Sequence, residues 1–65
     1  MIAKAIHWSN GTVMVFDERG NQLPEHQGLY TNVRQSVLDN APDNCVFMNG
    51  YWDGGRLEMV DRDSW

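Results

Sequence analysis

Apolar residues gather in two segments, one near each end of the chain, and a short glycine-containing turn interrupts each segment. The first turn is residues 8–12 (WSNGT) and the second is residues 52–56 (WDGGR). Asn-Gly and Gly-Gly pairs tolerate positive φ at both central positions of a type I′ turn, which matches the twist of two antiparallel strands. Each segment is therefore predicted to form a β-hairpin.

A two-residue loop at Asn10 and Gly11 sets the predicted register of the first hairpin. The predicted pairs are Trp8–Val13, Ile6–Val15 and Lys4–Asp17 on one face, and His7–Met14 and Ala5–Phe16 on the other. Aromatic and β-branched pairs stabilise such a ladder by roughly 0.2–1 kcal/mol each. Both faces are partly apolar, so the pattern leaves open which face a helix covers.

In the second hairpin, a loop at Gly54 and Gly55 is predicted to place Trp52 opposite Leu57. A loop at Asp53 and Gly54 would instead shift the pairing by two residues. We favour the Gly54-Gly55 loop because it places the apolar residues on one face. These residues are Val46, Met48, Trp52, Leu57 and Met59.

A turn signal, a short strand and a helix are predicted between the hairpins. Residues 17–21 (DERGN) form the turn signal, in which Gly20 or Asn21 can adopt the left-handed conformation. A short third strand is predicted at Gln22 and Leu23, and Pro24 is expected to end it because proline cannot donate to a ladder.

The single predicted helix has apolar residues at helical spacing, and Thr31 or Asn32 can cap its N-terminus. Pro42 is expected to end this helix, since the residue before a proline avoids the helical region. The apolar positions are Val33, Val37, Leu38 and Ala41.

The order hairpin, helix, hairpin predicts an α+β fold, a small antiparallel sheet of four or five strands with one short helix packed on it. Residues 1–65 are expected to form a single domain with a thin core, because so short a chain buries only about 60% of its unfolded surface. One cysteine rules out an internal disulfide. Self-association can supply the missing stabilisation, so we expect a homodimer.

The chain carries a formal net charge of −4, from five Lys and Arg against nine Asp and Glu. Binding to nucleic-acid phosphates needs clustered cations, so this balance disfavours nucleic acid and favours neutral or basic partners. The N-terminal residues lack the charged start and apolar core of a signal peptide, and no apolar run reaches the ~18 residues that span a bilayer. We therefore expect a cytoplasmic protein without membrane association.

Four residues are able to compose a metal or nucleophile site, but none sits at a recognised ligand spacing. They are His7, Glu25, His26 and Cys45. A Cys45–His7 pair would need an orienting third group and an oxyanion donor in a cleft, which a domain this thin rarely encloses. We therefore predict no catalytic residue, metal or cofactor, and a small Cys/His enzyme is the least favoured function.

Aromatic residues carry the main functional signal, because three Trp, two Tyr and two Phe are more large rings than a thin core can hide. Exposed aromatics are enriched at interface hot spots. The sequence therefore predicts a non-enzymatic binding protein that acts through protein–protein contacts. The predicted partner-binding residues are Phe47, Tyr51, Trp52, Arg56 and Trp65. The alternative is a nucleic-acid accessory protein that stacks bases on Tyr51 and Trp52 beside Arg56.

The segment GTVMVFDERGNQLPEHQGLY, followed by the short helix and the hairpin NGYWDGGRLEM, resembles small uncharacterised proteins encoded by bacteriophages and prophages. The resemblance covers most of the chain and lies in the pattern of turns and strands. It implies a bacterial cytoplasmic setting and a compact accessory protein that binds and modulates a host component. It carries over no catalytic residues.

Overall fold

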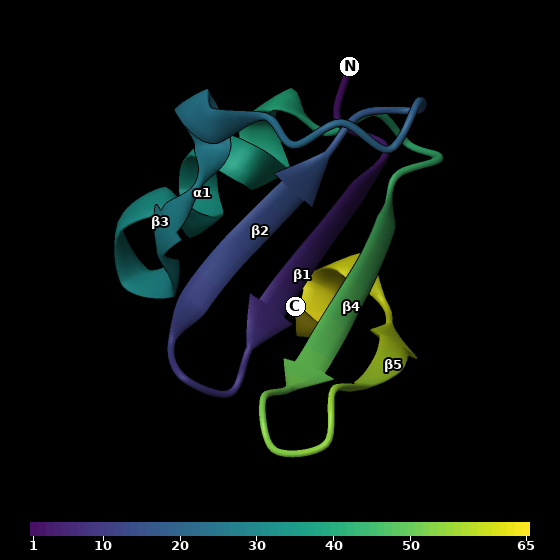
Figure 1. The fold of residues 1–65 in the computed structure, drawn as a ribbon. Helices are drawn as coiled ribbons and strands as arrows, with labels where there is room; N and C mark the ends of the chain where they lie inside the picture. Colours follow the sequence, from purple (N-terminus) through teal and green to yellow (C-terminus); the bar gives the residue numbers. More distant parts are fainter.

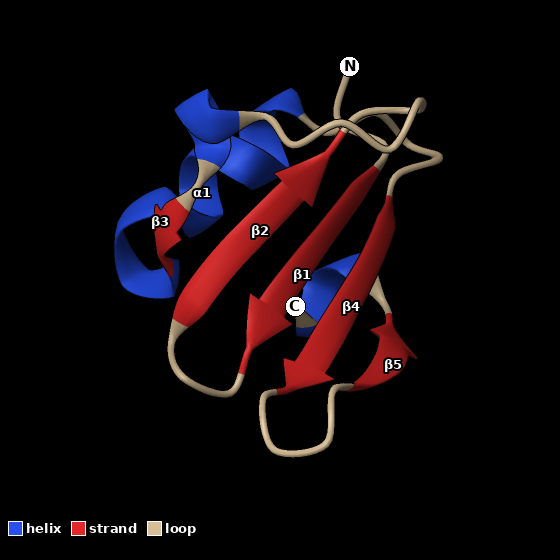
Figure 2. Ribbon diagram, in the orientation of Figure 1, coloured by secondary structure: helices blue, strands red, loops and turns tan.

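The computed structural model describes all 65 residues and forms one sheet whose strands lie in the order β3-β2-β1-β4-β5 (Figure 1). The elements are β1 (Lys4–Trp8), β2 (Thr12–Phe16), the 3-10 turn η1 (Pro24–His26), β3 (Gly28–Leu29), α1 (Tyr30–Asn40), β4 (Val46–Tyr51), β5 (Arg56–Val60) and the 3-10 turn η2 (Arg62–Ser64). Figure 2 shows the five strands and the single α-helix, which confirm the predicted α+β class.

The two hairpins join through a parallel pairing of β1 with β4, so the sheet is mixed and not wholly antiparallel. Ala5 lies beside Phe47 and Ile6 beside Met48. Both strands start at the end of the sheet nearest the N-terminus (Figure 1), because the chain returns to that end through α1. Such a return is the usual way to connect parallel strands.

The core lies between α1 and one face of the sheet. Val37 is the buried residue of α1, and Val33 and Leu38 pack half-buried beside the core. Of the four apolar positions predicted for the helix, two are therefore only partly covered, and Ala41 is buried just beyond the last helical residue. The buried cluster consists of Ile2, Ala5, Val13, Val15, Val37, Ala41, Phe47 and Trp65.

The helix ends at the predicted position but begins earlier. Ala41 follows its last residue in an extended conformation, just before Pro42. At the other end, Leu29 occupies the N-cap position without a side-chain cap, so the predicted caps at Thr31 or Asn32 are wrong. The N–H of Tyr30 instead donates to the carbonyl oxygen of Gly11 at 2.9 Å. The turn of the first hairpin therefore satisfies an amide that a capping side chain would otherwise serve.

The first hairpin turns through Ser9, Asn10 and Gly11, so the register predicted from a two-residue loop is wrong by one residue. A type I′ turn needs positive φ at Asn10, but positive φ occurs only at glycines, including Gly11 at 92°. Asn10 Oδ1 instead accepts hydrogen bonds from the N–H and the hydroxyl of Thr12, at 3.1 and 2.6 Å. The observed pairs are Lys4–Phe16, Ala5–Val15, Ile6–Met14 and His7–Val13.

The second hairpin connects through residues 52–55, and the favoured register is wrong by two residues. The alternative register, that of an Asp53-Gly54 loop, is the observed one. Trp52 leaves the ladder because its N–H donates to Ser9 Oγ at 2.9 Å. A shift of two residues keeps every side chain on its predicted face. The observed pairs are Phe47–Val60, Met48–Met59, Asn49–Glu58, Gly50–Leu57 and Tyr51–Arg56.

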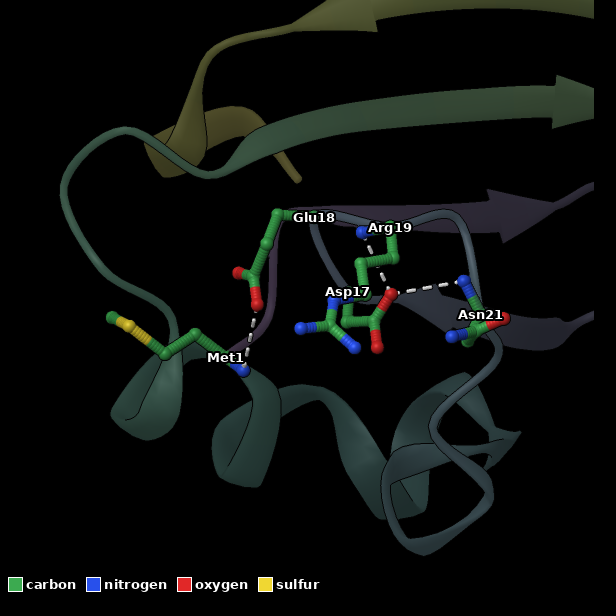
Figure 3. A network of polar contacts seen from close by, with 5 residues as sticks. All are labelled: Met1, Asp17, Glu18, Arg19 and Asn21. Carbon is green, nitrogen blue, oxygen red and sulfur yellow. Dashed lines mark hydrogen bonds and ion pairs between the residues drawn. The ribbon is translucent and has the colours of Figure 1, made fainter.

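The turn predicted at residues 17–21 is confirmed, with Gly20 at a φ of 85°. Asp17 Oδ1 accepts the N–H groups of Asn21 and Arg19, each at 2.9 Å (Figure 3). The Asn21 bond is the main reason that the pKa of the Asp17 carboxyl is lowered. The N-terminal ammonium of Met1 lies 3.8 Å from Glu18 and makes the only ion pair of the chain.

The third strand lies later than predicted. Gln22 makes only an isolated bridge to Phe16, because Pro24 begins η1 directly afterwards. The chain then returns to the same edge of the sheet, where β3 pairs with Thr12 and Val13 of β2. The prediction of a strand at Gln22 and Leu23 is therefore wrong, although the edge of the sheet that it would occupy is the observed one.

The C-terminal segment closes the core from the helix side. Trp65 is buried, and its Nε1 donates to the carbonyl oxygen of Met48 at 3.0 Å. The Tyr30 hydroxyl and Arg34 Nε both donate to the main-chain oxygen of Trp65. Arg62 donates to the carbonyl oxygen of Leu38 in the last turn of α1 and to those of Ala41 and Pro42 just beyond it. Carbonyl groups at a helix end lack partners within the helix.

The positive φ values at Gly54 and Gly55, 91° and 70°, make this turn sensitive to β-branched residues. A Cβ added at either position would have no neighbouring atom within 4 Å, so backbone strain alone opposes substitution. We predict that Gly54→Val or Gly55→Val lowers the free energy of unfolding by about 1 kcal/mol or more. Denaturant midpoints measure the change, and variants as stable as the parent would contradict the described turn.

Candidate protein-binding surface

The sheet face turned away from α1 carries mostly apolar side chains, and we call it the open face. Ile6 shows that this face is separate from the core: it is only 3% exposed yet lies outside the core cluster, so side chains of the open face bury it. The strand residues of the open face are Lys4, Ile6, Trp8, Thr12, Met14, Phe16, Leu29, Val46, Met48, Gly50, Leu57 and Met59, and Trp52 from the adjoining turn extends it.

Large apolar side chains on the open face remain in contact with solvent. Met59 is 70% exposed, Trp52 is 61% exposed and Leu57 is 43% exposed. All three belong to the second hairpin, so most of the exposed apolar area lies at the β5 side of the sheet. Leu29, 55% exposed, lies apart from them at the β3 edge. A contiguous exposed apolar patch of this kind is characteristic of an interaction site.

The strand positions of the open face include no carboxylate, although the chain has nine Asp and Glu. Lys4 is the only charged residue among these positions, and its Nζ lies 5.0 Å from the centre of the Phe16 ring. Glu58, the one acidic residue within a strand, pairs with Asn49 and projects to the helix side. The negative charge of the chain therefore lies outside the strand positions of the open face.

At one end of the open face, Trp8 contacts both Gly50 and Trp52. Its ring lies against Gly50, where a Cβ would come within 2.5 Å of Trp8 Cε3. Trp52 packs edge-on against the same ring, with 5.3 Å between the ring centres and an angle of 88°. Gly50 thus provides a flat backbone surface for Trp8, and Trp8 holds Trp52 beside the sheet.

A cavity of about 140 Å³ lies at the carboxyl ends of β1 and β4. This volume is well below the ~300 Å³ or more that is typical of small-molecule sites. Nε1 of Trp8 is buried without a hydrogen-bond partner, so one polar group beside the cavity is unsatisfied. The lining residues are His7, Trp8, Ser9, Asn49, Gly50 and Tyr51.

The structure divides the five residues predicted to bind a partner among three environments. Phe47 and Trp65 are 4% and 2% exposed and belong to the core, so the prediction that they form a partner surface is wrong. Tyr51 and Arg56 pair across β4 and β5 on the helix side. Trp52 alone lies on the open face.

Arg56 and Tyr51 already interact with each other. The Arg56 guanidinium carbon lies 4.4 Å from the centre of the Tyr51 ring, which is a favourable cation–π distance. The face of the Tyr51 ring that Arg56 contacts is therefore covered, and a nucleic-acid base cannot stack on it.

The structure does not bring Cys45 and His7 together. In the parallel register, His7 lies beside Asn49, while Cys45 precedes the first residue of β4. Four residues of strand separate Cys45 from Asn49, a distance of about 13 Å. Burial raises the pKa of the Cys45 thiol, which favours the protonated form over the nucleophilic thiolate.

His7 instead packs as a neutral ring beneath α1. It stacks on Tyr30 with 3.6 Å between ring centres and an angle of 9°, and Trp65 lies edge-on at 6.5 Å. Burial lowers the pKa of the imidazole below its ordinary value of 6.5. The chain contains no group of three or more His, Cys, Asp or Glu side chains placed to hold a metal ion. No helix has the length and apolar character needed to cross a membrane.

Most residues of the open face are absent from the predicted partner set. Met14 and Phe16 were missed because the predicted set was drawn from the second hairpin and the C-terminal tail, and Met48 was missed because it is not aromatic. The alternation of side chains in the second hairpin did place Met48, Leu57 and Met59 on a common face. The missing information was the parallel pairing of β1 with β4, which joins this face to that of the first hairpin.

No protein-family description, curated protein or solved structure matches this chain.

The contact between Trp8 and Gly50 predicts a destabilising effect of Gly50→Ala. The added methyl group would displace the Trp8 ring from the sheet, and overpacking of this kind costs about 1–3 kcal/mol. Thermal or denaturant unfolding measures the loss. The same substitution in a Trp8→Val background is the control, because there the loss should largely disappear. An equal loss in both backgrounds would show that Trp8 does not rest on Gly50.

The lowered pKa of His7 predicts that acid destabilises the fold. The unfolded chain takes up a proton near pH 6.5 before the folded chain does, so stability is lost as the pH falls from 6.5 toward the folded-state pKa. Unfolding measured between about pH 7 and about pH 5 should show this slope. His7→Phe keeps a ring on Tyr30 and should remove the slope, whereas His26→Gln should retain it. An unchanged slope in His7→Phe would contradict the assignment.

Proposed function

We propose that this chain is a small non-enzymatic binding protein that docks another protein on its open face. The observation that carries the proposal is the one-sided cover of the sheet: α1 and the C-terminal segment pack on one face, while the opposite face keeps large apolar side chains exposed. Covering such side chains in an interface contributes about 25 cal/mol per Å² of apolar area.

The partner best suited to this surface has a complementary apolar patch with a neutral or basic rim. Apolar contact would fill the centre of the interface, where Trp52 and Met59 project. The net charge of −4 would repel an acidic rim on the partner and attract a basic one. Trp52 is the expected anchor, because exposed tryptophans contribute a disproportionate share of interface energy.

Two observations favour this function over the alternatives raised by the sequence. Arg56 covers the Tyr51 ring, so the residues suggested for base stacking are engaged with each other. His7 is stacked on Tyr30 and lies far along the sheet from Cys45, so the residues suggested for catalysis are separated. The protein-binding hypothesis needs neither arrangement.

The resemblance to proteins of bacteriophages and prophages supports a more specific version of the proposal. In that version the chain is a cytoplasmic accessory protein, and the docked partner is a component of a bacterial host. An apolar face on a chain of net charge −4 suits a partner that otherwise meets a negatively charged ligand, because the two would compete for the same basic surface.

Capture from a lysate of the source cells tests the proposal, with the immobilised chain as bait and mass spectrometry as the readout. Trp52→Ala and Met59→Lys should each reduce the captured partner at least tenfold, since they remove an anchor or place a charge in the apolar centre. Leu29→Lys is the matched control, because Leu29 is 55% exposed on the same face but lies in β3, at the edge of the sheet opposite to β5.

Circular dichroism of each variant must first show the parent fold. Equal capture by the parent and by folded Met59→Lys would contradict docking on the open face. Loss of capture in Leu29→Lys together with retention in Met59→Lys would place the interface at the opposite edge instead.

A further inference from the structure

The two edges of the sheet differ in how well they are protected. At one edge, β3 has only two residues, and η1 with its proline adjoins it. At the other edge, β5 has five residues, and four of them are exposed. It contains no Pro, and its two charged residues, Arg56 and Glu58, have opposite signs, so they do not repel a second strand that sets them opposite each other. The β5 edge is therefore open to strand addition.

The backbone hydrogen bonds of β4 show which groups of β5 face outward. The N–H of Val46 donates to Ala3, and the carbonyl oxygen of Gly50 accepts from Ser9, so these residues of β4 turn their backbone groups toward β1. Because the direction alternates along a strand, Asn49 turns toward β5 and bonds with Glu58, its partner in the ladder. The backbone groups of Leu57 and Met59 then point away from the sheet.

We infer that β5 pairs antiparallel with β5 of a second copy of this chain, with Leu57 on the two-fold axis. In this register the outward backbone groups of the two Leu57 residues bond to each other. Arg56 of each copy then lies opposite Glu58 of the other, on the helix side of the sheet. The open faces of both copies become one continuous surface.

Charge selects this register over its neighbours. A pairing centred on Glu58 would set two carboxylates directly opposite each other, and a pairing centred on Arg56 would do the same with two guanidinium groups; like charges in such positions destabilise a sheet. A pairing centred on Met59 would place Arg56 opposite Arg62 of the second copy. Only the pairing centred on Leu57 joins opposite charges twice.

Arg56 and Glu58 are both free to form these pairs. The only ion pair within the chain joins Met1 and Glu18, so neither charge is neutralised in the single copy. Arg56 rests on the Tyr51 ring, and the Tyr51 hydroxyl lies 3.5 Å from Glu58 Oε1. Tyr51 thus holds the two charged side chains side by side on the same face.

The expected dimer is weak and depends on concentration. Stable interfaces bury about 800 Å² on each partner, which is roughly a fifth of the 4211 Å² that this chain exposes. A single strand edge with its flanking side chains covers less than that. The β5 interface would exist in addition to the open face, on which the proposed function depends. The chain can therefore be monomeric and still bind a partner on its open face.

Sedimentation equilibrium of charge variants tests the inference. The parent should associate at high concentration to twice its mass of 7.5 kDa. Arg56→Glu and Glu58→Arg should each weaken self-association at least tenfold, because each creates two like-charged pairs. An equimolar mixture of the two variants should associate as a heterodimer, since both cross-strand pairs become complementary again. The double variant R56E/E58R should also restore the dimer.

Glu25→Arg is the matched control, because it changes the net charge by the same amount as Glu58→Arg at an exposed position outside β5. Its dimer should match that of the parent. A parent that stays monomeric at every concentration would overturn the inference. So would a dimer that Met48→Lys abolishes while both single charge variants retain it, because the second copy would then occupy the open face.

Discussion

The parallel pairing of β1 with β4 is the constraint on which the rest of the molecule depends. Each hairpin could form from local sequence alone, but only this pairing places them in one sheet. It sets Phe47 beside Ala5 under the helix, and it sets Met48 beside Ile6 on the opposite face. The core and the open face are therefore two consequences of the same register.

The small size of the core explains why only one face of the sheet is covered. With 10 of 65 residues buried, the chain can cover only one face of its sheet. It covers that face with α1 and closes it with Trp65, which is bonded to Met48 from one side and to Tyr30 and Arg34 from the other. The second face is stabilised by its own side chains, most clearly where Trp8 rests on Gly50. Its outer apolar surface remains available for a partner.

The sequence was sufficient for features that depend on neighbours along the chain. The hairpin positions, the positive φ at Gly54 and Gly55, the turn at residues 17–21 and the end of the helix before Pro42 all follow from local conformational preferences. Both predicted hairpin registers were wrong because specific side-chain contacts determine them. The Asn10 side chain bonds to Thr12, and the first turn is not of type I′. Trp52 leaves the ladder because it contacts Ser9 and Trp8.

The candidate site was harder to predict than the fold. Composition correctly indicated that some large apolar side chains must be exposed, and Trp52 is among them. It could not indicate that Phe47 and Trp65 are the rings that the core takes up, because that depends on how the C-terminal segment folds back beneath β4. Composition also did not indicate Met48 and Met59 as surface residues, because they join the open face only when the two hairpins pair in one sheet.

Amide hydrogen exchange along β5 tests most directly whether the free edge of this sheet pairs with a second chain. The outward N–H of Leu57 should exchange freely in dilute solution and become protected as the concentration rises, while the N–H of Glu58, which is bonded within the hairpin, should be protected throughout. A Leu57 amide that exchanges at the same fast rate at every concentration would contradict the pairing of β5 with a second copy.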